Sequence, residues 1–575
     1  MKNQELDKLP ANALSYIETV AAKSSLFKRM RLEVRRELAS HFADAIGAAN
    51  GNAEQAADLL IREFGDPRLL AKLIRRGKTR CQPLWLQGIL WAFGLGLLTG
   101  VPIMVYGIYL NFVGTPVRDT DYLAVMNERA APQDANPDEN AWPHYVTAIT
   151  DLDHPAEIRA LLTTWRAGCG CGGDINLAPP PLEPNDLPVV KAWIDRAGPV
   201  WVACVTGAGK PWCWRTYVPR DGDTRLWAVG PAYEIPRNWL TLTYIPLRFA
   251  YHRDTGDIDA AVEDALVLAK MGAHFSRFGA WTEGEQTYGF GNLKYAGTML
   301  RSLVPQLARD HLTDIQAQLE ALVPDGFPEA DGSTFRLAAL DLVQHTYSSG
   351  GVFGGHFMPR YFRTVDGYYP GFNAYPGDGV LDKLALPVVF TLGGMLVPGR
   401  DAAEDRIERA YAEYAPLLRM SPYERHAEGP GNDLARTQPP KPNRFIRALQ
   451  LPMKAISYGV GTIGQRNGIE RWWMIADADA RYATKAGYEA TLAVIALQLY
   501  KLDKGQYPDA LDPLLAGYLR KMPSDPWGGG PLRYIRKGNK FLLYGIRSDF
   551  TDNGGQHPDP DNPQAQADVI YADWP

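Results

Sequence analysis

The chain has 575 residues, of which 46% are hydrophobic and 22% are charged. This length is typical of about three to four domains, and the apolar fraction is sufficient for packed cores. A wholly disordered chain, a collagen-like chain and a small disulfide-stapled scaffold are therefore excluded. The formal net charge of −5 lacks the basic excess of a nucleic-acid-binding protein.

Residues 1–80 are predicted to form a small helical module. Between Leu26 and Ile74, apolar residues recur three and four positions apart, which indicates two or three short helices. Asn52 is expected to cap a helix that Gly65 and Pro67 bring to an end.

This module resembles the permease-prefix or HAAS-type domain, a helical module found ahead of membrane segments in bacterial proteins. The resemblance implies a regulatory contact in the cytoplasm rather than a reaction. The matching residues are Arg36-Glu37-Leu38, His41, Glu54-Gln55-Ala56 and Phe64-Gly65-Asp66-Pro67.

Residues 84–113 are predicted to cross a membrane once as a helix. They lie in a stretch without any charged side chain, from Cys81 to Val117. About 20 apolar residues are enough to cross a hydrocarbon layer of about 30 Å. A buried core helix is usually shorter, and the long polar segment that precedes the stretch is unlike the start of a secretory signal peptide.

Basic residues predict the orientation of this span. Seven lysines and arginines precede it and two follow it closely: Arg62, Arg68, Lys72, Arg75, Arg76, Lys78 and Arg80 before, and Arg118 and Arg129 after. The positive-inside rule then places the N-terminus in the cytoplasm. We therefore expect a protein of the inner (cytoplasmic) membrane whose C-terminal bulk lies in the periplasm.

A linker and a mixed region are expected after the span. Residues 114–138 are rich in Asp, Asn, Pro and Ala, which favours a linker, and residues 139–235 contain four cysteines. In an oxidising compartment these cysteines could form two disulfides in any of three pairings, and zinc ligation or unpaired thiols are the alternatives. They are Cys169, Cys171, Cys204 and Cys213.

Residues 236–470 are predicted to form an extracytoplasmic helical region. Alanine and leucine recur at helical spacing, and Asp257 is expected to cap a helix. The helix pairs are similar to a tetratricopeptide array, although no clean repeat of about 34 residues is present. Stacked helix pairs commonly form concave surfaces that bind partners or ligands.

Residues 471–575 are predicted to form a small α+β domain, so that the chain as a whole is mostly α. A helix ending near Leu502 and a short helix at Leu511 to Gly517 are expected. Two strands, LRYIR and KFLLYGI, then flank a Gly-Asn turn, and an acidic loop follows.

This last segment resembles the globular half of the major pseudopilins of type II secretion. The matching residues include Gly505-Gln506-Tyr507-Pro508, Pro523-Ser524-Asp525-Pro526-Trp527-Gly528, Leu543-Tyr544-Gly545, Asp552-Asn553-Gly554-Gly555 and Ala567-Asp568-Val569-Ile570. Arg547 and Phe550 stand where the family usually has glycine. No prepilin leader precedes the segment, so assembly into a pilus-like filament is not expected.

The resemblance implies a calcium site in the terminal loop, with Asp549 and Asp568 at ligand positions. The residues themselves are compatible, because a hard cation takes about six to eight oxygen ligands. Asp549, Asp552 and Asp568, with Asp559, Asp561 and loop carbonyls, could supply them. A merely solvated acidic loop is the alternative.

The best enzyme candidate is the glycine-rich stretch around residues 345–366. His345, Ser349, His356 and Asp366 could form a nucleophile–base arrangement, with Ser348 as a second serine. A turn-rich loop whose aromatic residues pack on helices explains the same composition. The sequence GAGKPW at Gly207 to Trp212 lacks the first glycine and the Ser or Thr of a phosphate loop.

Two functional interpretations follow. The favoured one is a single-pass anchored protein that binds or scaffolds a protein partner outside the cytoplasm, without nucleic acid and with no small-molecule ligand identified. The alternative is a membrane-anchored periplasmic hydrolase that uses the 345–366 loop. The combination of parts resembles large membrane-anchored proteins of planctomycete-type bacteria.

Overall fold

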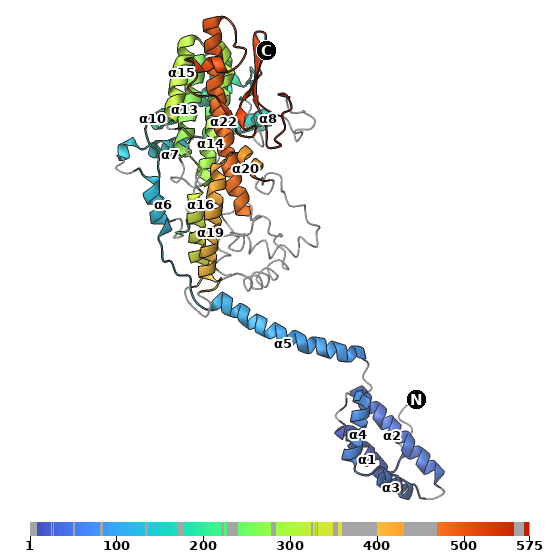
Figure 1. The fold of residues 1–575 in the computed structure, drawn as a ribbon. Helices are drawn as coiled ribbons and strands as arrows, with labels where there is room; N and C mark the ends of the chain where they lie inside the picture. Colours follow the sequence, from blue (N-terminus) through green and yellow to red (C-terminus); the bar gives the residue numbers. More distant parts are fainter. Residues whose placement is uncertain are drawn as a thin grey trace. The chain divides into compact units, whose positions relative to one another are not determined.

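The computed structural model describes residues 8–24, 26, 28–49, 52–80, 84–132, 136–169, 178–219, 224–226, 240–277, 283–323, 326–327, 329, 332–348, 355–358, 361, 399–429, 469–556 and 568–573. The chain forms two compact units, Met1–Tyr106 and Gly107–Pro575, each with its own hydrophobic core. Helices dominate the described residues, and the sheets lie near the C-terminus, which confirms the predicted mostly helical fold with a small α+β end (Figure 1).

The first unit contains four short helices: α1 (Ala11–Lys23), α2 (Lys28–Ala48), α3 (Ala53–Phe64) and α4 (Pro67–Arg80). Their core is built around the rings of Tyr16, Phe42 and Phe64, whose centroids lie 5.9–6.4 Å apart. The predicted cap is confirmed, because the Asn52 side chain accepts a hydrogen bond from the Glu54 N–H at 3.0 Å. Gly65, with φ +72°, ends α3 as expected.

Helix α5 (Leu84–Phe112) contains the predicted span. The section Gly88–Leu110 of this helix is long and apolar enough to cross a membrane. None of its most apolar 18-residue stretch is buried in the protein. Large side chains such as Trp91 and Leu98 are exposed along it. Such a surface is unfavourable in water and compatible with membrane anchoring.

The second unit consists mainly of helices, and its longest helices come after α12 (Ile245–Thr255). The earlier ones are α6 (Tyr122–Ala130), α7 (Trp142–Asp151), α8 (Ala156–Cys169), α9 (Leu187–Arg196) and α10 (Gly198–Ala208). The later ones are α12, α13 (Ile258–Phe275), α14 (Glu283–Leu303), α15 (Arg309–Leu322), α16 (Ser333–Thr346), α19 (Arg400–Arg419), α20 (Pro422–Glu428) and α22 (Ile469–Lys504). The predicted cap Asp257 is confirmed, since its side chain accepts from the Ala260 N–H.

Helices α13, α14 and α22 run side by side (Figure 1), and glycines allow their close approach. A methyl group at Gly289 in α14 would lie 2.5 Å from backbone atoms of Phe275 and Ser276. On the other side of α14, a methyl group at Gly297 would lie 2.8 Å from the Thr491 hydroxyl of α22. The backbones can therefore pack this closely only where a side chain is absent.

The C-terminal strands form an antiparallel sheet in the order β3–β4–β5, made of Arg533–Lys537, Lys540–Gly545 and Val569–Asp573. Gly538 and Asn539 form the predicted hairpin turn between β3 and β4. A smaller sheet pairs β1 (Ser524–Asp525) with β2 (Gly530–Pro531). Phe541 and Leu543 belong to the same apolar cluster as α13, α14 and α22, so the C-terminal segment has no separate core.

The segment 114–138, predicted as a linker, contains helix α6 and a short 3₁₀ turn at Pro137–Glu139. Leu123 and Met126 of α6 are buried in a cluster with Leu337. The Asn127 side chain also bonds the backbone of Tyr217 in both directions, at 2.9 and 2.6 Å. This part of the chain is therefore packed onto the second unit rather than extended as a stalk.

We expect the glycines of α14 to respond oppositely to a methyl group. Gly289→Ala should lower the free energy of unfolding by about 1–3 kcal/mol, because the added carbon meets backbone that has no room to move. Gly291→Ala in the same helix meets nothing within 4 Å and should raise it by up to about 1 kcal/mol through helix propensity. Unfolding of both variants, followed by circular dichroism, measures the difference, and equal shifts would contradict the packing.

Candidate functional sites: the acidic loop and the membrane-helix junction

The loop after β4 carries the three aspartates predicted as metal ligands. Asp549 and Asp568 are buried, whereas Asp552 is exposed. Short turns shape the loop: Asp549 accepts from the Thr551 N–H, and Asp552 accepts from the Gly554 N–H at 2.9 Å. Gly554 and Gly555 both have positive φ, a backbone conformation that side chains disfavour.

Asp568 is the most constrained of the three carboxylates. Its Oδ2 accepts from the backbone N–H groups of Asn553 and Gly555 at 3.0 and 2.8 Å. Its Oδ1 is buried and has no hydrogen-bond partner among the described residues. Burial raises the pKa of Asp568 and the charges of Asp552 and Asp549 add to the rise, while the two N–H groups oppose it.

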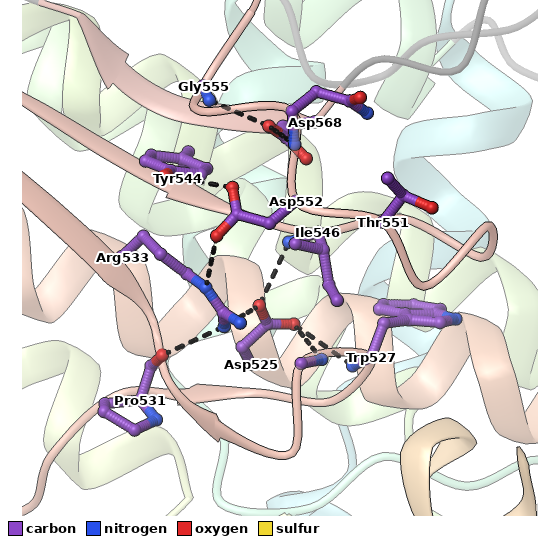
Figure 2. A network of polar contacts seen from close by, with 12 residues as sticks. Asp525, Trp527, Pro531, Arg533, Tyr544, Ile546, Thr551, Asp552, Gly555 and Asp568 are labelled. Carbon is purple, nitrogen blue, oxygen red and sulfur yellow. Dashed lines mark hydrogen bonds and ion pairs between the residues drawn. The ribbon is translucent and has the colours of Figure 1, made fainter.

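Asp552 is already compensated. It accepts from Arg533 Nε at 3.3 Å and from the Tyr544 hydroxyl at 3.1 Å (Figure 2). Burial raises its pKa, but the Gly554 N–H, Tyr544 and Arg533 outweigh that effect, so the pKa is lowered overall. Figure 2 shows Asp552 turned to Arg533 and Tyr544, and Asp568 turned to Gly555.

Asp525 joins the loop to both sheets, a role that the sequence did not reveal. Its Oδ1 accepts from the N–H groups of Trp527 and Gly528, and its Oδ2 accepts from the Ile546 N–H at 3.0 Å and from Arg533 Nη1 at 2.6 Å (Figure 2). The side chain is almost completely buried. Four donors on one buried carboxylate offset the cost of removing its charge from water.

The oxygen atoms of these aspartates meet the requirements of a hard cation only in part. The candidate ligands are all oxygens, and one buried oxygen of Asp568 lacks a hydrogen bond. Within the described ranges, however, no group of three or more His, Cys, Asp or Glu residues could hold a metal ion. Asp559 and Asp561 lie outside the described residues.

Phe550 occupies the left-handed region, with φ +57°, at one of the positions where the resembled family usually has glycine. This conformation costs a non-glycine residue about 1 kcal/mol or more. Its ring stacks on His426 of α20, with centroids 4.0 Å apart and planes within 13°. The stacking offsets the strain and attaches the loop to α20.

The two histidines of the enzyme candidate have different partners. His345 Nε2 lies 3.4 Å from Asp341 Oδ1, one turn earlier in α16. His356 Nδ1 lies 3.0 Å from Ser348 Oγ, but Ser348 is buried and its hydroxyl also accepts from the His356 backbone N–H. Ser349 and Asp366 lie outside the described residues.

His356 packs against the C-terminal end of α5. Its ring centroid lies 4.9 Å from that of Tyr109. Burial lowers the pKa of His356, and the backbone carbonyls of Val113 and Leu110 oppose that shift. The Ser348–His356 pair therefore forms part of a contact with the C-terminal end of the apolar helix α5.

The residues that directly follow α5 contact other parts of the second unit. Gly114 has φ +89°, and a methyl group there would lie 3.1 Å from Ser348 Cβ. Pro116 forms a bridge with Ser348. We call residues 114–121, together with the side chains that bind them, the junction.

Two polar side chains complete the junction. Arg400, at the start of α19, donates to the Val117 carbonyl at 3.1 Å and to Asp119 at 2.5 Å. Gln344 of α16 donates to the Thr120 carbonyl at 2.8 Å and accepts from the Thr120 N–H. The residues that follow α5 are therefore held by α16 and α19 of the second unit rather than left as a free stalk.

The cysteine alternatives are resolved for two of the four residues. Cys204 and Cys213 are buried free thiols rather than partners in a disulfide. Burial raises the pKa of Cys204 to about 12 and raises the pKa of Cys213 well above its usual value, so neither is a reactive thiolate at neutral pH. Cys171 lies outside the described residues, as does the side chain of Cys169.

Removing the arginine of the junction should expose the chain to protease. We expect Arg400→Ala to speed tryptic cleavage after Arg118 several-fold, because Val117 and Asp119 lose their partner. Timed digestion of the detergent-solubilised protein measures the rate. Arg409→Ala is the matched control, because among the described residues Arg409 donates to the Asp405 carbonyl of its own helix and not to the junction. Equal rates would show that Arg400 does not hold the junction.

Comparisons with known proteins place one part of the chain. No protein-family model and no solved structure matches it. The chain is similar to Type II secretion system core protein G of Pseudomonas aeruginosa, with 33% identity over an alignment of 98 residues that covers 14% of this chain and 68% of that protein. The predicted pseudopilin-like region is thereby supported, and most of the chain lies outside the match. Over the matched segment, this chain belongs to the family of Type II secretion system core protein G.

Proposed function

We propose that the protein is a single-pass, membrane-anchored scaffold that binds a protein partner outside the cytoplasm. The junction is the observation that carries this proposal. Because Arg400 and Gln344 bind the residues immediately after α5, the second unit would follow directly on the end of the span, without a mobile tether between them. A body fixed in this way suits the positioning of partners better than capture by a mobile tether.

The orientation that we propose has the first unit in the cytoplasm and the second in the periplasm. Seven basic residues before α5 against two shortly after it support this orientation. The resemblance of the first unit to HAAS-type modules supports a regulatory contact on the cytoplasmic side. The related protein is named as a core protein of a secretion system, which favours protein partners over a small-molecule substrate.

We place calcium in the loop between β4 and β5 as part of this proposal. Asp568 and Asp549 would hold the ion, with further oxygen ligands from the loop. The buried Oδ1 of Asp568 is the feature that supports it, because a cation would supply the missing partner. Bound calcium would hold Asp549 and Asp568 together next to Phe550, which stacks on His426 of α20.

Calcium should stabilise the protein through Asp568. We expect added calcium to raise both the thermal midpoint and the free energy of unfolding, the latter by about 2.7 kcal/mol when calcium is at 100 times its dissociation constant. Asp568→Asn should abolish this rise.

The pH dependence without calcium is a second expectation. In the presence of chelator, the raised pKa of Asp568 should make the free energy of unfolding fall as pH rises from about 4 towards neutrality, because the native state favours the protonated form. Scanning calorimetry measures both effects.

Asp512→Asn, at an exposed aspartate, is the matched control and should keep the full response. A midpoint indifferent to calcium in the unchanged protein would remove the metal from the proposal. The scaffold itself would remain, since the junction does not involve the loop.

The scaffold is tested by the side of the membrane on which the body lies and by what it retains. Alkaline phosphatase fused after Pro575 should be active, and a green fluorescent protein at the same place should be dark, because only the former matures in the periplasm. The full chain, captured from detergent-solubilised membranes, should retain the same polypeptide in repeated preparations. A cytoplasmic C-terminus, or no retained polypeptide with or without calcium, would contradict the proposed function.

A further inference from the structure

Helix α4 carries an unusual set of side chains. It contains six cations and no acidic residue: Arg68, Lys72, Arg75, Arg76, Lys78 and Arg80. Each of the other three helices of this bundle carries at least one acidic residue. The imbalance is therefore confined to the helix that leads directly into α5.

One face of α4 packs into the bundle and the other does not. Ala71 is fully buried, and Leu70 and Ile74 pack against the core. Leu69 and Leu73, four residues apart and therefore on one face, are 62% and 66% exposed. Two leucines so exposed on a short helix are not needed by the core.

The exposed cations surround these leucines. Arg68 and Lys72 are exposed next to them in the helix, as are Arg75 and Arg76. Lys78 lies 3.5 Å from Glu37 and 3.8 Å from Glu33 of α2 and is not counted in this set. We call Arg68, Leu69, Lys72, Leu73, Arg75 and Arg76 the outer face of α4.

The outer face of α4 lies close along the chain to the predicted membrane span. Helix α4 ends at Arg80 and α5 begins at Leu84, so three residues separate the two helices. Even fully extended, this connection reaches about 14 Å. The end of α4 therefore cannot lie far from the lipid headgroups that surround the start of α5.

We infer that α4 lies on the bilayer surface and binds anionic lipid headgroups through its outer face. Its cations contact the headgroups, and Leu69 and Leu73 enter the boundary of the acyl chains. A helix with exposed leucines flanked by cations has the chemistry of an interfacial helix. If the cations served only to orient α5, the leucines would stay in water.

Accessibility of a nitroxide in the full chain tests this binding. The label is placed at Leu73→Cys in a background with Cys81, Cys169 and Cys171 replaced by serine, since Cys204 and Cys213 are buried. The protein is reconstituted into nanodiscs of phosphatidylcholine, alone or mixed equally with phosphatidylglycerol. We expect the label to be accessible to oxygen and shielded from a water-soluble nickel chelate in the anionic discs, and less shielded in the neutral ones.

Charge reversal separates headgroup binding from simple burial. Arg68→Glu with Lys72→Glu should release the label into water, because each cation at an anionic surface changes binding by about fivefold. Arg31→Glu with Arg36→Glu, at exposed positions of α2, is the matched control and should have no such effect. Ser40→Cys, also exposed on α2, gives the reference for a label in water.

Two results would overturn the inference. A label at Leu73 as open to nickel as one at Ser40, in both lipids, would show that α4 does not touch the bilayer. Equal shielding in neutral and anionic discs would exclude recognition of anionic headgroups. If either charge-reversal variant loses its helical circular dichroism, the comparison of neutral and anionic discs for the protein with unchanged charges decides the question instead.

Discussion

The second unit depends on the close packing of α14 between α13 and α22. Glycines at 272, 289 and 297 remove the side chains that would keep these backbones apart. α22 then carries the packing in both directions, because its first half contributes to the cluster with α16 and α19 and its second half to the cluster with the C-terminal strands. A single 36-residue helix thus joins the cluster with α16 and α19 to the pseudopilin-like end.

The buried carboxylates of the second unit differ in the hydrogen-bond donors that surround them. Asp264 in α13 is fully buried but bonded to Arg248 at 2.6 Å and to His252 at 2.7 Å, and Asp525 has four donors. Both are compensated within the protein, as buried carboxylates must be. Asp568 differs in having one oxygen for which the described residues provide no donor. This contrast is the feature on which the proposed calcium site rests.

Local signals in the sequence were sufficient for much of the fold. The caps at Asn52 and Asp257, the turn at Gly538-Asn539 and the charge-free helix are each specified within a few residues, so they could be predicted. Helix α6 was taken for a linker because its stability comes from Tyr217 and Leu337, far along the chain. The likeness to HAAS modules and to tetratricopeptide arrays stays a prediction.

The candidate sites were less predictable for the same reason. The residue types of the Ser348–His356 pair were visible in the sequence, but the burial of Ser348 and its contact with α5 depend on tertiary packing. Asp525 acquires its role only when Arg533 and Ile546 come together around it. A disulfide between Cys204 and Cys213 was open by composition, yet both are buried as free thiols.

The acidic loop and the junction are connected through α19. Phe550 stacks on α20, whose Arg425 donates to the Met420 carbonyl after the end of α19 and pairs with Asp479 of α22. The other end of α19 begins with Arg400 in the junction, about 30 Å away along a helix of 20 residues. Contiguous contacts do not by themselves couple two sites, because coupling needs an element with two arrangements. Asp568 would be that element if a cation binds its buried Oδ1, and α19 is the helix that lies between this part of the unit and the junction.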